Sequence, residues 1–282
     1  MIKWGAYWRL TRLNKPVGIL LLWYPTAWAL WIANQGMPSL KLLFLFFIGT
    51  VLMRSAGCVI NDIADRKIDK HVARTKLRPL TSNEICLTEA CIILGVLLFC
   101  SLMVLINLPW ACFYPALISV FITFLYPYCK RFINAPQVVL GLAFSMGIPM
   151  AYIASSVPLN GDSILLFILN FAWIVAYDTM YAMTDKADDL LIGVKSTAIY
   201  FASYDKFIIG FLLLSMHALW LFWAVVNELH FGFYLLWVLA SGVLFYQQRL
   251  IANRVPQECF KAFLVSTYYG ALMWLAVGLG MM

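Results

Sequence analysis

Two short clusters of carboxylates stand out in a chain that is otherwise mostly apolar. The first lies in residues 61–69 and the second in residues 178–189. Together they hold seven of the 13 acidic residues of a 282-residue chain that is 63% hydrophobic and only 12% charged. Each cluster follows a long apolar run, at the depth where a membrane-spanning helix reaches water. Ionisable groups at that depth are costly and usually mark a functional site.

The spacing in the first cluster predicts a stripe of oxygen ligands on one face of a helix. Asn61, Asp65 and Asp69 follow one another at intervals of four residues, and Asp62 lies at the edge of the same stripe. Carboxylates stacked in this way repel one another unless a positive charge lies between them. The stripe therefore predicts a bound cation.

The second cluster repeats the pattern. Asp185 and Asp189 are four residues apart with Asp188 beside them, and Asp178 lies two helical turns deeper on the same face. Hard oxygen ligands of this kind suit Mg²⁺, which binds through one or two carboxylates together with substrate phosphates. We predict a pair of facing Mg²⁺ sites that hold a diphosphate. The alternative, solvated acids that balance nearby Lys and Arg, does not explain the helical spacing.

A third segment adds positive charge. Tyr126 and Lys130 are four residues apart at the end of another apolar run, and Arg131 follows them. Lys130 and Arg131 are suited to neutralise a diphosphate or to pair with a substrate carboxylate. Anchoring at the cytoplasmic side of the membrane explains the two basic residues equally well. The sequence has no P-loop and no zinc spacing among its seven cysteines, so other chemistries find no support.

The elements that must position these residues are membrane spans. Apolar runs of about 20 residues are long enough to cross a bilayer as helices. Nine are expected, roughly at 17–35, 40–60, 85–107, 109–129, 136–154, 163–183, 206–227, 231–247 and 260–281. They leave no room for a soluble domain. The fold class is therefore all-α, a polytopic membrane bundle of about nine helices that forms a single domain over residues 1–282.

The basic residues predict how this bundle is oriented. Of the 20 basic residues, all fall in alternate connections except Lys41, in an opposite connection, and Arg54, inside a span. By the positive-inside rule, the N-terminus is cytoplasmic and the C-terminus lies outside the cytoplasmic membrane. The longer connections, 61–84, 184–205 and 248–259, then share the inner face, which predicts a cytoplasm-facing active-site cavity. Residues 1–15 are expected to form a basic interfacial segment. The same bias accounts for the net charge of +7 without nucleic acid.

The two motifs resemble the signatures of a known family. Asn61-Asp62-x-x-Asp65-x-x-x-Asp69 and Asp185-x-x-x-Asp189 are similar to the paired signatures of the UbiA-type intramembrane aromatic prenyltransferases, and the nine spans agree with that fold. The resemblance to the 4-hydroxybenzoate polyprenyltransferase branch is carried by Arg66-Lys67 and by three segments, 134–137, 177–183 and 193–198.

The resemblance implies roles for particular residues. The Mg²⁺-diphosphate would be held by Asn61, Asp65, Asp69, Asp185 and Asp189, with Asp62 as a further metal ligand. Tyr126, Lys130 and Lys186 would surround the diphosphate or the nascent cation, and Arg66 or Arg131 would bind the benzoate carboxylate. The implied substrates are an all-trans polyprenyl diphosphate, expected to be octaprenyl, and 4-hydroxybenzoate, joined at C3 in ubiquinone biosynthesis in a bacterial inner membrane.

Two alternatives remain open at this point. One keeps the chemistry and changes the acceptor to a naphthoate, homogentisate or a porphyrin. The other is an ion-coupled transporter that uses the acids as cation sites, although such sites are expected near the bilayer midplane rather than toward one face. No residue pattern sets the prenyl chain length or the oligomeric state.

Overall fold

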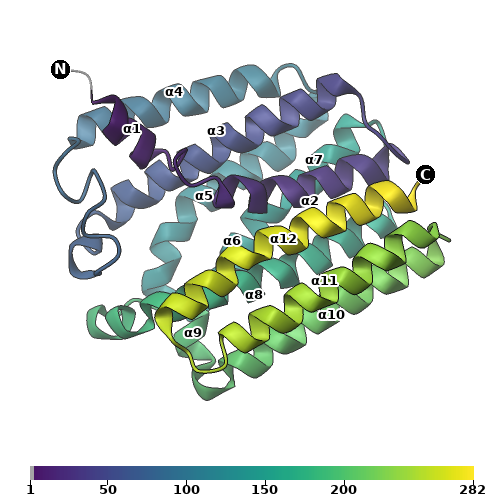
Figure 1. Ribbon diagram of the computed structural model, residues 1–282. Coiled ribbons are helices and arrows are strands. Elements are labelled where there is room, and N and C mark those ends of the chain that lie inside the picture. Colours follow the sequence, from purple (N-terminus) through teal and green to yellow (C-terminus); the bar gives the residue numbers. More distant parts are fainter. Residues whose placement is uncertain (1–2) are drawn as a thin grey trace.

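The computed structural model describes residues 3–282 as a bundle of helices (Figure 1). The α-helices are α1 (Trp4–Leu10), α2 (Val17–Ala33), α3 (Leu40–Asp65), α4 (Leu87–Leu105), α5 (Phe113–Phe132), α6 (Pro136–Ser145), α7 (Gly147–Ala154), α8 (Gly161–Ile192), α9 (Thr197–Tyr200), α10 (Asp205–Val226), α11 (Phe231–Leu250) and α12 (Pro256–Gly280). Single 3₁₀ turns are η1 (Asp69–His71), η2 (Trp110–Cys112) and η3 (Ala202–Tyr204).

The expected spans are confirmed. Eight helical segments in the described part of the chain are long and apolar enough to cross a membrane, and α2 is a shorter apolar helix that supplies the ninth. The protein is a multi-pass membrane protein. Helix α1 and the last turn of α12 lie at opposite ends of the bundle (Figure 1), as an odd number of spans requires.

One expected span is interrupted. Residues 136–154 form α6 and α7, which meet at Met146. Pro149 lies one turn into α7 and has no N–H to donate to the carbonyl of Ser145. The proline therefore breaks the continuous helix that the hydropathy pattern predicts.

The helix that carries the second acidic motif is longer than expected. The sequence predicts a span that ends near residue 183 and a connection over 184–205, whereas α8 continues as a helix to Ile192. It begins with a capping box in which the Asn160 side chain accepts from the Ser163 N–H at 3.1 Å. It ends at Gly193, whose φ of 71° lies in the left-handed region that favours glycine. The second motif is thus held on rigid helix.

Aromatic side chains fill the centre of the bundle. Trp28 of α2 packs against Trp173 of α8 and Trp220 of α10, with ring centroids 5.2 and 5.3 Å apart. All three are fully buried. By contrast, α4 buries little of its surface, so lipid would face most of that helix. The core therefore joins α2, α8 and α10 and fixes how α8 is presented to the rest of the bundle.

The N-terminal segment packs on the end of the bundle that bears the first motif. In α1, Ala6 and Leu10 are buried against Val59 of α3 and Leu80 of the following loop, while Trp4 is exposed. The basic interfacial segment expected over residues 1–15 falls on this helix and the residues after it, with residues 1 and 2 outside the described chain. The loop after α3 and the end of α8 lie at the same end of the molecule (Figure 1).

Candidate active site

The first motif straddles the end of α3. Asn61, Asp62 and Asp65 lie on the last turn of the helix, but the helix ends at Asp65, and Asp69 begins the turn η1. The sequence predicts one continuous helical stripe, so this part of the expectation is wrong. The backbone turns because Asp69 is held from the loop that follows: the Thr75 hydroxyl donates to the Asp69 carbonyl at 2.9 Å. Asp69 remains buried beside Asp65.

A lysine from α5 bridges two ligands of the first motif. Lys130 Nζ donates to Asn61 Oδ1 at 3.0 Å and to Asp65 Oδ2 at 3.1 Å. The same ammonium lies 5.1 Å from the ring centroid of Tyr126, a cation–π distance. The structure therefore brings together four residues that the sequence analysis proposed for the site, two from α5 and two from α3. The two oxygens converge on a positive charge.

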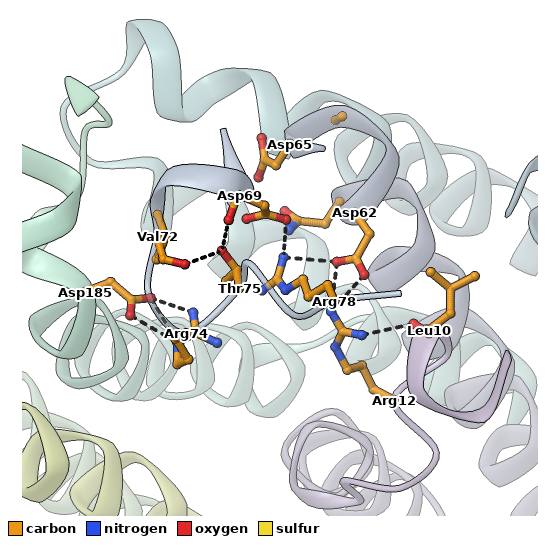
Figure 2. Close-up of polar contacts among 12 residues, drawn as sticks. Leu10, Arg12, Asp62, Asp65, Asp69, Val72, Arg74, Thr75, Arg78 and Asp185 are labelled. Carbon is orange, nitrogen blue, oxygen red and sulfur yellow. Dashed lines mark hydrogen bonds and ion pairs between the residues drawn. The ribbon is translucent and has the colours of Figure 1, made fainter. Parts of the chain in front are cut away.

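Two arginines hold Asp62. Arg12, just after α1, donates from Nη2 to both oxygens of Asp62 at 2.8 and 2.9 Å. Arg78, from the loop after α3, donates from Nη1 to Asp62 Oδ1 at 3.0 Å (Figure 2). Asp62 is only 1% exposed. Its carboxylate therefore anchors the N-terminal segment and the loop to α3 in this structure.

Arg78 also reaches the third acid of the motif. Its Nη1 donates to Asp69 Oδ2 at 2.7 Å, so Figure 2 shows the guanidinium lying between Asp62 and Asp69. Burial raises the pKa of Asp69 above its ordinary value, and Arg78 opposes that shift. Burial alone would lower the pKa of Arg78, but Asp62 and Asp69 raise it above its ordinary value.

The second motif is tied to the first through this loop. Arg74 donates from Nε to Asp185 Oδ1 at 3.0 Å, and the Ala73 N–H donates to Asp188 Oδ2 at 3.0 Å. Arg74 also lies over the ring of Tyr181, 4.7 Å from its centroid. Figure 2 shows the loop after α3 crossing from the first motif to Asp185. The loop after α3 therefore contacts both carboxylate clusters, although these are far apart in the sequence.

The donor set fits a divalent cation that binds with a phosphate. Within residues 3–282, no three acidic, His or Cys side chains converge closely enough to bind a metal ion by themselves. Mg²⁺ needs only one or two protein carboxylates, because waters and substrate phosphates supply its other ligands. Lys130 already places a positive charge between Asn61 and Asp65, and Arg74 places one on Asp185. The oxygens of both motifs therefore already contact positively charged side chains, as they would contact a bound metal ion.

Three nominated cations lie away from the carboxylates of the two motifs. Arg66 and Arg131 line an open pocket of about 550 Å³ together with Ile63, Ala64, Lys67, Ile68, Leu87 and Tyr128. Arg131 Nη2 donates to the Ala64 carbonyl at 3.0 Å, and its guanidinium lies over the Tyr128 ring.

The third of these cations, Lys186, donates from Nζ to Asp205 Oδ2 at 3.3 Å. Asp205, fully buried, also accepts from Arg254 at 3.0 Å, so this ion-pair group braces α8 against α10 and the loop after α11.

Sequence reasoning missed several cations that the fold places at the site. The positive-inside pattern explains Arg12, Arg74 and Arg78 without a further role, and only the fold shows that each contacts an acid of the motifs. Arg54 lies inside α3 with a buried Nε that has no hydrogen-bond partner among the described residues. A guanidinium inside a membrane span is costly, so the position of Arg54 in an apolar run is a signal that the sequence contains.

Comparisons with known proteins give a consistent result. The UbiA prenyltransferase family model matches residues 22–276. The 4-hydroxybenzoate octaprenyltransferase of Legionella pneumophila (strain Corby) is 69% identical over 281 residues, covering 100% of both chains. The 4-hydroxybenzoate octaprenyltransferase of Aliivibrio fischeri (strain MJ11) is 47% identical and covers 98% of this chain and 96% of its own.

Solved structures agree in fold. A UbiA homologue from Aeropyrum pernix K1, without ligand, superposes with a TM-score of 0.78 at 20% identity, covering 94% of this chain and 98% of that one. A UbiA homologue from Archaeoglobus fulgidus bound to GPP and Mg²⁺ superposes with a TM-score of 0.73 at 18% identity, covering 96% and 99%. With both acidic motifs at one end of an all-helical bundle and a family match over almost the whole length, this chain belongs to the UbiA prenyltransferase family.

Proposed function

We propose that this protein transfers a polyprenyl group, octaprenyl by similarity to its relatives, from its diphosphate to C3 of 4-hydroxybenzoate in ubiquinone biosynthesis. Relatives of that activity match the entire chain at 69% identity. The structural observation that carries the proposal is the link between the two acidic motifs, in which Arg74 of the first loop donates to Asp185 of the second motif. A single diphosphate bound between the two motifs would lie within reach of residues from both.

The donor diphosphate is assigned to the oxygens of the two motifs. Asn61, Asp65 and Asp69 would hold Mg²⁺ from one side and Asp185 and Asp189 from the other. Bound Mg²⁺ would draw negative charge from the leaving diphosphate, which weakens the allylic C–O bond. Asp62, also nominated as a ligand, is engaged by two arginines, and we assign it to ordering the site.

The chain's own cations and rings serve the departing group and the carbocation. Lys130 and Arg74 lie beside the motif oxygens and would pair with the diphosphate as its negative charge grows. The face of Tyr126, already against Lys130, would stabilise the allylic cation. Water would quench such a cation, and the apolar bundle excludes it from the reacting carbon.

The benzoate carboxylate requires a positively charged partner. The family resemblance nominates Arg66 and Arg131, which share one open pocket. The observation that adds Arg54 as a candidate is its position inside α3 with a buried, unsatisfied Nε. These three arginines are our candidates for the partner of the benzoate carboxylate, and substitution of each in turn distinguishes them.

We further propose that the site opens to the cytoplasm. Both motifs lie at the end of the bundle that bears most of the basic connections, which the positive-inside rule assigns to the cytoplasmic side. A periplasm-active reporter fused after Met282 should be active, and one fused in the loop after α3 should be inactive. The opposite result would reverse the orientation.

The function is tested with membranes that contain the expressed chain, labelled 4-hydroxybenzoate, octaprenyl diphosphate and Mg²⁺. We expect 3-octaprenyl-4-hydroxybenzoate, loss of product on chelation, and recovery when Mg²⁺ is restored. Turnover of a naphthoate, homogentisate or a porphyrin with no turnover of hydroxybenzoate would move the chain to another acceptor class. Membranes without the chain are the control.

A further inference from the structure

An acid inside the bundle is left without a role by the diphosphate site. Asp178 lies on α8 seven residues before Asp185. Seven residues are two helical turns, so the side chain lies on the same face, about 10 Å deeper along the helix. This position is below the diphosphate and at the level that the prenyl chain and the acceptor ring must reach.

Asp178 has no hydrogen-bond or ion-pair partner among residues 3–282. Within residues 3–282, every other acid of α3 and α8 has a partner, except Asp189 of the second motif. The partners are Arg12 and Arg78 for Asp62, Lys130 for Asp65, Trp223 for Asp162, Arg74 for Asp185 and the Ala73 N–H for Asp188. Asp178 is partly exposed, whereas Tyr177 and Thr179 beside it are buried. An unpaired acid is expensive at this depth, so its position indicates use with a substrate.

Charged and aromatic residues of three helices lie within electrostatic range of Asp178. Arg54 of α3 and Lys130 of α5 are the cations whose charges act on Asp178, and its own charge acts on Tyr126 and Tyr177. Two buried polar atoms of this set, Arg54 Nε and the Tyr177 hydroxyl, have no hydrogen-bond partner in the described chain. Unsatisfied polar groups of α3 and α8 therefore lie in the same part of the bundle as this partly exposed carboxylate.

We propose that Asp178 is the catalytic base that removes the ring proton after prenyl transfer, an assignment that rests on the proposed function. The C–O bond of the donor breaks and its electron pair leaves with the diphosphate. A π electron pair of the hydroxybenzoate ring forms the bond from C3 to C1 of the prenyl chain, which leaves the ring cationic. The C3–H bond then breaks, its electron pair returns to the ring, and the proton moves to an Asp178 carboxylate oxygen.

The other acids are less suited to this step. Asp65 and Asp185 lie at the inner end and are paired with Lys130 and Arg74. Asp189 is four residues farther toward that end than Asp185. The acceptor ring must lie beyond the diphosphate, because it attacks the carbon that the diphosphate leaves. Asp178 is the carboxylate of α8 at that level.

The test is Asp178→Asn, which keeps the shape of the side chain and removes the base. We expect prenyl transfer to slow by about 10²- to 10⁴-fold, the usual contribution of a positioned base. With 4-hydroxybenzoate deuterated at C3 and C5, the native protein should show no isotope effect, since proton loss follows the slower bond formation. The variant should show a normal primary isotope effect because proton loss has become limiting. Binding of a non-reactive thiolodiphosphate analogue of the donor with Mg²⁺ should be unchanged.

Asp162→Asn is the matched control on the same helix, where an amide oxygen can still accept from Trp223 as the carboxylate does at 3.0 Å. Native transfer rate in Asp178→Asn, a slower rate without an isotope effect, or loss of donor binding would each overturn the assignment. If the Asn variant does not accumulate in membranes, Asp178→Ala removes the base as well and decides the question: slow transfer with an isotope effect supports the base, and a native rate or the lack of an isotope effect rejects it. Absence of product from the native chain would instead reject the proposed function, and this proposal with it.

Discussion

Arg74 Nε donates to Asp185 Oδ1 at 3.0 Å and joins residues 111 positions apart in the sequence. The contact holds the loop after α3 against the end of α8. The guanidinium that pairs with the second motif therefore belongs to the loop that follows the first motif. Burial alone would lower the pKa of Arg74, but Tyr181 and Asp185 raise it above its ordinary value, so the guanidinium stays charged.

Arg74→Gln should weaken use of the donor. When Asp185 turns to a bound metal, the guanidinium would pair with the diphosphate, and a hydrogen bond to a charged group contributes about 1.5–3 kcal/mol. We expect the KM for prenyl diphosphate to rise by about 10- to 100-fold, with the KM for hydroxybenzoate unchanged. Steady-state kinetics in membranes measure both, and Arg249→Gln, at the end of α11, is the control. An unchanged donor KM would remove Arg74 from the site.

Arg78→Ala should act mainly on stability. It would leave Asp62 and Asp69 without a partner that now lies 3.0 and 2.7 Å away. Removing one member of a buried ion pair costs about 3–5 kcal/mol. Thermal unfolding of purified protein in detergent should show a clear fall in Tm. The same Tm as the native protein would mean that Arg12 alone can hold Asp62.

The three candidate arginines for the benzoate carboxylate can be separated by kinetics. Arg54→Gln, Arg66→Gln and Arg131→Gln each remove one guanidinium. We expect the variant that has lost the carboxylate partner to raise the KM for hydroxybenzoate while the donor KM stays constant, because only the acceptor carries a carboxylate. Benzamide analogues without the charge should be unaffected by that variant. Unchanged acceptor KM in all three variants would contradict a role for these arginines.

Gly193→Ala should strain the end of α8. The φ of Gly193 is 71°, a conformation that costs a residue with a Cβ about 1–2 kcal/mol. Stability should fall by that amount, measured as the free energy of unfolding in detergent. Gly161→Ala is the matched control at the other end of the same helix, since nothing lies within 4 Å of its added Cβ. Equal effects of the two changes would show that the left-handed conformation is not required.

The sequence predicted the spans well because apolar length is the main requirement for crossing a bilayer. It also placed Asn61 and Asp65 on one helix face, since their spacing follows from helix geometry. Lys130 was expected beside them only from the family resemblance. It did not foresee that α3 stops at Asp65, because hydrogen bonds from Thr75 and Arg78 reshape the chain there.

The arginine partners escaped sequence reasoning for a different reason. Positive charge on the cytoplasmic side is expected for any membrane protein, so Arg12, Arg74 and Arg78 carried no separate signal. Lys186 follows Asp185 directly and was nominated with it, yet it points to Asp205 of α10. Only the packing of α8 against α10 determines that direction. Adjacency in the sequence does not place two side chains on one face.

The central claim is that both acidic motifs hold the same diphosphate, and donor binding tests it most directly. Calorimetric titration in detergent would measure Mg²⁺-dependent binding of the thiolodiphosphate analogue to the native protein, Asp65→Asn and Asp185→Asn, with Glu228→Gln as the control at the far end of the bundle. We expect native and control proteins to bind, and each motif variant to lose binding while keeping the native Tm. Native affinity in either motif variant would contradict a shared site.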